Sequence, residues 1–100
     1  MEPSEALGEL RNRFLGGKHR LGEIFMHTEA LEEIAGENEA LLGEVSRLLD
    51  QATPGGNFHV WLDGGRLTDE GFVYFYDRKP AEVAGVIGKA LLRAKRAEAA

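Results

Sequence analysis

The stretch NFHVWLDGGRLTDEGFVYFYD, residues 57–77, holds most of the aromatic rings of this 100-residue chain and decides the fold that the sequence predicts. It consists of two short apolar runs, residues 57–62 and 71–77, joined by a polar connection that contains Gly64 and Gly65. Side chains alternate between the two faces of a strand, and paired glycines permit the positive φ of a tight turn. The pattern therefore predicts a β-hairpin that is apolar on both faces.

A two-stranded hairpin alone is only marginally stable in water, so this one needs a covering on both faces. Either the helices of the chain cover both faces, or one face meets another chain. Tyrosine and tryptophan are enriched at protein interfaces, because the ring is apolar while its polar end tolerates water. On the second interpretation, the binding residues are the polar aromatics of one face and the neighbouring histidine, namely Trp61, Tyr74, Tyr76 and His59.

Helices are predicted before the hairpin. Residues 4–15 form a short helix with Ser4 as its N-cap. From Ile24 to Ala52, apolar residues recur at alternating spacings of three and four when the polar His27 and Asn38 are included, which is typical of a helix packed along a seam. We expect one helix over residues 29–52 with a kink near Gly36, in which Asn38 belongs to the seam and fixes its register. Alternatively the chain breaks at Gly36, and Asn38 caps a second helix.

The last helix follows the hairpin and begins near Pro80, since a missing N–H costs nothing in the first turn of a helix. Its apolar stripe recurs at helical spacing along Val83, Val86, Ile87, Ala90, Leu91 and Ala94. The sequence leaves residues 21–28 open between strand and helix.

These elements predict one α+β domain over residues 1–100, in which a long central helix and a C-terminal helix pack on a small antiparallel sheet. The sheet contains the hairpin, with or without a third strand. The chain has no cysteine, shows no signal peptide and contains no apolar run long enough to cross a bilayer. We therefore expect a cytoplasmic protein without a membrane partner.

Charge is unevenly distributed along the chain, whose net charge is −5. Residues 21–50 carry eight acidic groups and one basic group, Arg47. Acidic surfaces attract basic protein surfaces and imitate the phosphates of nucleic acid, whereas a charged outer face is also the ordinary state of a surface helix. On the functional interpretation, the central helix contributes three binding residues, Glu32, Glu33 and Glu37.

Little in the sequence points to catalysis or to a cofactor. Its two serines, Ser4 and Ser46, lie in predicted helices, and no nucleophile motif surrounds either. His19, Glu23 and His27 would line one face of a helix at spacings of four, a geometry that can bind zinc. Pairing between neighbours on a surface helix is the commoner reason for that spacing. We therefore expect no metal, no cofactor and no enzymatic activity.

Basic residues gather near both ends of the chain, where together they could hold phosphates. The two groups are Arg11, Arg13, Lys18, His19 and Arg20, and Lys89, Arg93, Lys95 and Arg96. Over residues 38–97 a helix is followed by GGNFHVWLDGGRLTD, a strand and a final helix with Ala90 and Ala94 near its end. In this order the chain resembles the small nucleoid-associated proteins of the YbaB type, although its DRKP connection is shorter. The resemblance implies a dimer that binds DNA.

The sequence thus favours a non-enzymatic protein-binding function of the adaptor, chaperone, immunity or inhibitor type. The protein partner would meet the acidic helix or the aromatic face of the sheet. We also expect self-association, with a dimer favoured. The alternative function is a small dimeric nucleoid-associated protein that binds DNA through the two basic groups.

Overall fold

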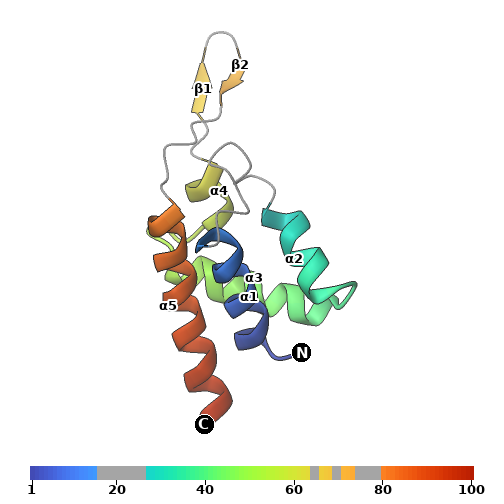
Figure 1. The fold of residues 1–100 in the computed structure, drawn as a ribbon. Coiled ribbons are helices and arrows are strands. Elements are labelled where there is room, and N and C mark those ends of the chain that lie inside the picture. Colours follow the sequence, from blue (N-terminus) through green and yellow to red (C-terminus); the bar gives the residue numbers. More distant parts are fainter. Residues whose placement is uncertain (16–26, 64–65, 69–70, 74–79) are drawn as a thin grey trace.

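The structure is a computed structural model that describes residues 1–15, 27–63, 66–68, 71–73 and 80–100 (Figure 1). Most of these residues are helical. The elements in chain order are α1 (Pro3–Leu15), α2 (His27–Ala35), α3 (Glu39–Ala52), α4 (Phe58–Asp63), β1 (Arg66–Thr68), β2 (Gly71–Val73) and α5 (Pro80–Ala99).

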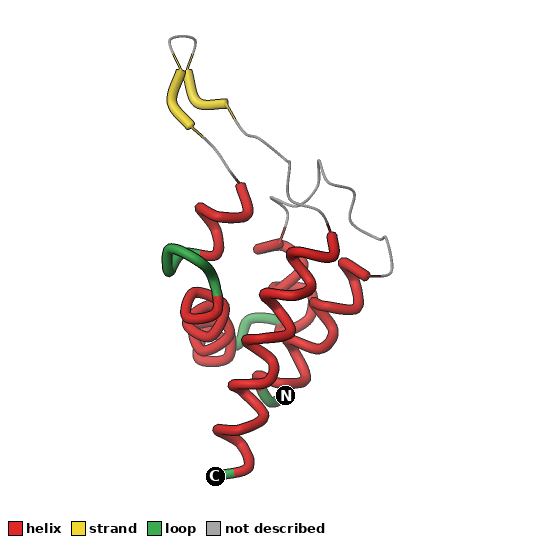
Figure 2. Tube along the Cα trace, turned by 90° about the vertical axis from the view of Figure 1, so that its left-hand side faces the viewer, coloured by secondary structure: helices red, strands yellow, loops and turns green. Residues whose placement is uncertain are grey.

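The helices pack on one another around a single apolar core. α1 lies alongside α5, and α3 crosses against both (Figures 1 and 2). Leu7, Leu10, Val45 and Ile87 are fully buried where these helices meet. Burying a side chain of this size stabilises a fold by about 1.5–3 kcal/mol, so this contact region accounts for much of the stability.

The predicted α+β fold is wrong, because the core of the described residues is made by helices alone. β1 and β2 are antiparallel strands of three residues each, with Leu67 opposite Phe72. Figure 1 shows this hairpin beyond the end of the helices, so it offers no sheet on which they could pack. The second predicted strand overlaps β2, whereas residues 74–77 lie outside the described residues.

The first predicted strand, residues 57–62, is wrong as well, because this segment forms α4. The Asn57 side chain accepts a hydrogen bond from the Val60 N–H at 3.0 Å, and the Asp50 carboxylate accepts one from the Phe58 N–H at 2.9 Å. These bonds satisfy amides that the first turn of a helix leaves without partners. A helix also places Phe58 and Leu62 on one face, and both are buried.

The single central helix over residues 29–52 is also wrong, and the break at Gly36 is confirmed. Gly36 has φ of 66°, and its N–H donates to the Glu32 carbonyl at 2.8 Å, which closes α2. Asn38 caps α3 by accepting a hydrogen bond from the Leu41 N–H at 3.1 Å. The seam residues of both helices lie in the core of the protein, among them Leu31, Leu41, Val45 and Leu48. Asn38 therefore does not fix the register of a seam between chains.

The first and last helices are confirmed. α1 begins at Pro3, so Ser4 lies inside the first turn and is not the N-cap. Its hydroxyl instead donates to the Glu98 carboxylate at 2.9 Å, which joins the beginning of α1 to the end of α5. α5 begins at Pro80 as predicted, and its stripe is buried from Val83 to Ala94 with Leu91 partly buried. Of residues 21–28, His27 and Thr28 begin α2, and the others lie outside the described residues.

Candidate functional site

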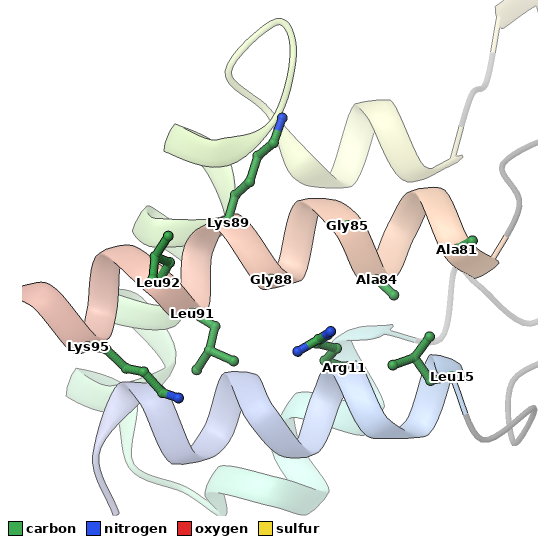
Figure 3. Close-up of a pocket in the computed structure, with 10 residues that line it drawn as sticks. All are labelled: Arg11, Leu15, Ala81, Ala84, Gly85, Gly88, Lys89, Leu91, Leu92 and Lys95. Atoms are coloured by element: carbon green, nitrogen blue, oxygen red, sulfur yellow. The ribbon is translucent and has the colours of Figure 1, made fainter.

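A hollow of about 570 Å³ lies on the surface between α1 and α5. The hollow forms because α5 presents small residues at its floor, including Ala84, Gly85 and Gly88 (Figure 3). From the opposite helix, α1, Arg11 and Leu15 line the hollow. We call this feature the α1–α5 groove.

The groove combines exposed apolar side chains with positive charge. Leu15 and Leu92 are 56% and 51% exposed, and they are two of the four large apolar side chains that the described residues leave exposed. Arg11, Lys89 and Lys95 supply three cations, and none of the described residues in the groove lining is acidic. In Figure 3, Lys95 reaches from α5 toward α1 and Lys89 points away from it, so the charges lie on both sides of the glycine floor.

The glycines of the floor are not required by the packing of this chain. A Cβ atom at Gly85 would meet nothing within 4 Å, and one at Gly88 would meet only Arg11 Nε at 3.8 Å, an ordinary contact. Glycine in the interior of a helix costs about 1 kcal/mol relative to alanine. Gly43 in α3 has equally open surroundings, so it serves as a matched reference for the groove glycines.

A second charged feature lies at the end of α2. Glu32, Glu33, Glu37 and Glu39 surround Gly36 in the connection between α2 and α3, and we call these four glutamates the acidic turn. Glu33 forms an ion pair with Arg13 of α1 at 2.6 Å. The other three line a surface hollow of about 530 Å³ together with Leu42. The predicted residues Glu32, Glu33 and Glu37 thus lie together on one exposed end of the molecule.

The predicted aromatic residues lie elsewhere. Trp61 is half-buried and packs against the core, with its ring centroid 6.1 Å from that of Phe58. His59 is exposed on α4. Tyr74 and Tyr76 lie outside the described residues, so the structure brings together only the α4 members of this set.

The two basic groups meet only in part. Arg11 of the first group lies in the same groove as Lys89 and Lys95 of the second, because α1 and α5 are neighbours. Arg13 is paired with Glu33 on the side of α2, and Arg93 and Arg96 are exposed outside the groove lining. The remaining members, Lys18, His19 and Arg20, lie outside the described residues.

The described part of the chain contains no group of three or more histidine, aspartate or glutamate side chains that could hold a metal ion. Of the three residues whose spacing could bind zinc, His19 and Glu23 lie outside the described residues, and His27 is the first residue of α2. One shifted carboxyl is Glu44, whose pKa is lowered because it accepts hydrogen bonds from Arg47 and faces that positive charge. Within the described ranges no helix is both long enough and apolar enough to cross a membrane.

Comparison with models of protein families, with curated proteins and with solved structures finds no match for this chain.

Sequence reasoning missed the groove, although one signal for it is present. Gly85 and Gly88 interrupt a helix that is otherwise rich in alanine and leucine, and Lys89 follows them directly. Two glycines three residues apart share a helix face, so together they open a hollow on it. The contribution of Leu15 has no such signal, because it depends on how α1 packs against α5.

Proposed function

We propose that this chain is a non-enzymatic protein-binding domain of the adaptor, chaperone, immunity or inhibitor type, which holds an acidic amphipathic helix of its partner in the α1–α5 groove. The observation that carries this proposal is the composition of the groove lining. Among the described residues, this lining joins two exposed leucines to three cations and contains no acidic side chain.

A helix is the partner element that fits this lining best. An amphipathic helix docks by laying its apolar face into an apolar groove, with anchors at spacings of three, four and seven. Leu15 and Leu92 would contact those anchors, and the glycine floor permits a close approach of the partner backbone. Glutamates beside the anchors would pair with Arg11, Lys89 and Lys95, which gives the partner its acidic character.

The strength of binding follows from these contacts. Exposed ion pairs contribute about 0.2–1 kcal/mol each, so removing two of the cations should weaken binding by about 2- to 30-fold. Because such pairs are screened by salt, the affinity should fall as the ionic strength rises.

The test uses a fluorescent helical peptide with leucines at helical spacing and glutamates elsewhere, measured by fluorescence anisotropy. Lys89→Gln with Lys95→Gln should weaken binding, because both lysines line the groove. Arg93→Gln with Arg96→Gln is the matched control, since it removes the same charge from the same helix outside the groove. Equal weakening by the two pairs, or no binding by the unaltered chain, would reject the proposal.

DNA binding is the second candidate function, and it is favoured by the position of Arg11 beside Lys89 and Lys95. Three phosphate contacts would give a slope of about −2.7 in log affinity against log salt. Protein binding is preferred because phosphates make no use of Leu15 and Leu92, and because the net charge is −5. A gel shift that is lost to the same degree with either pair of substitutions would favour DNA instead.

A further inference from the structure

We infer that the α1–α5 groove also takes the acidic turn of a second copy of this chain, so that chains associate head to tail. This inference rests on the proposed function, because it uses the same groove. It assigns the groove and the acidic turn to the two sides of one interface.

The two features have complementary charge. Among the residues that the structure describes, the groove lining contains three cations and no acid, whereas Glu32, Glu37 and Glu39 form no ion pair. Glu32 also lies near the C-terminal end of α2, where the helix dipole disfavours a negative charge. Contact with Arg11, Lys89 and Lys95 would relieve both the mutual repulsion of the glutamates and this dipole effect.

The acidic turn also offers apolar surface next to its charges. Leu42 is only partly buried, and it lines the same hollow as Glu32, Glu37 and Glu39. It can meet Leu15 and Leu92 in the groove of another copy. This pairing would place a small apolar contact at the centre and ion pairs at the rim.

The two features lie on different sides of the molecule. In Figure 1 α5 lies on one side of α1, and α2 with its connection to α3 lies on the other. A contact between the groove of one copy and the acidic turn of the next is therefore heterologous, and it leaves one free groove and one free turn at the ends of every assembly that does not close into a ring.

The association should be weak. A stable interface buries about 800 Å² on each partner, which is roughly one-eighth of the 6164 Å² surface of this chain. One or two helical turns in the groove bury less than this, so assembly should depend on concentration and should weaken as salt rises.

Sedimentation velocity on three forms of the full chain tests the inference. The groove variant carries Gly85→Gln, Lys89→Gln and Lys95→Gln, and the turn variant carries Glu32→Gln, Glu37→Gln and Glu39→Gln. All six positions are exposed, so both variants should keep the helix content of the unaltered chain. We expect each variant alone to self-associate about 2- to 150-fold more weakly than the unaltered chain, since each loses two or three exposed ion pairs.

Mixing the variants gives the decisive result. The intact turn of the groove variant should enter the intact groove of the turn variant, so the mixture should form a one-to-one dimer that neither variant forms alone. A mixture that stays monomeric where the unaltered chain associates would overturn the inference, as would an unaltered chain that is monomeric at every concentration at low salt. If the acidic peptide still binds the groove in that case, the inference fails while the proposed function stands.

Discussion

Replacing Gly85 by alanine should make the protein more stable, which is the opposite of what a required glycine would do. Gly85 lies in the interior of α5 with a helical backbone, and a Cβ atom there would meet nothing within 4 Å. Alanine loses less backbone freedom than glycine on folding, so the free energy of unfolding should rise by about 0.4–1 kcal/mol. For a domain of this size, that corresponds to an increase in Tm of about 2–8 °C.

Thermal unfolding followed by circular dichroism measures this change, with Gly43→Ala as the matched control. Gly43 is also exposed in the interior of a helix and has equally open surroundings, so it should give a similar gain. A lower Tm for Gly85→Ala than for the unaltered chain would refute the reasoning, because it would mean that the packing of α5 itself needs the glycine.

The same two positions separate stability from binding. Gly85→Gln places a long side chain over the groove floor and should weaken binding of the acidic peptide, while Gly43→Gln should leave it unchanged. Equal affinities for the two glutamine variants would show that the glycine floor of the groove has no part in binding.

Three further predictions concern the fold. Phe58→Ala should lower the free energy of unfolding in urea by about 3–5 kcal/mol, because the ring is only 2% exposed and fixes α4 to the core; a loss below about 1 kcal/mol would contradict that role. Asn38→Ala should cost about 1 kcal/mol and Asn38→Gly only a few tenths, since the side chain caps α3; equal losses would argue against the cap. The pKa of Glu44 is lowered by Arg47, so the pair should stabilise the fold above the ordinary carboxyl pKa and cease to do so as the pH falls through the lowered value. NMR titration should show the Glu44 pKa rising in Arg47→Gln, and an unchanged value would count against this pairing.

The sequence predicts the helices whose apolar stripe is long and regular. α5 is recognisable because Pro80 marks its beginning and the stripe from Val83 to Ala94 continues for several turns. α1 is recognisable for the same reason. Only its N-cap differs from the prediction, because the helix begins at Pro3, a residue that suits the first turn, and Ser4 therefore lies inside the helix.

The strand prediction for residues 57–62 is wrong because the apolar residues of this short run fit both the strand period and the helix period. Phe58, Val60 and Leu62 alternate as in a strand, but Phe58 and Leu62 also share a helix face. The local signal that separates the two readings is Asn57, which caps the first turn of α4. Similarly, the heptad spacing continues through Gly36 without a gap, although the positive φ of that residue ends the helix.

The charged residues of the acidic turn and of the groove could be picked out from the sequence, but the geometry of the groove could not. The acidic residues Glu32, Glu33 and Glu37 stand out from charge alone, and the structure leaves all three exposed, although their role in binding stays a prediction. The groove itself could not be predicted from the sequence, because it forms only where α1 packs against α5. Its cations come from both ends of the chain, and from the sequence they were candidates for phosphate binding. Leu15 and Leu92, which favour a protein partner over DNA, are recognisable only by their exposure in the folded chain.

The most direct test of the groove as the binding surface is an NMR titration of the isotope-labelled chain with the acidic helical peptide. If the peptide binds in the groove, the amides of Leu15, Gly85, Gly88 and Leu92 should shift and saturate together, and the affinity should fall as salt is added. Shifts centred on His59 and Trp61 of α4, with the α1–α5 groove unaffected, would contradict this expectation.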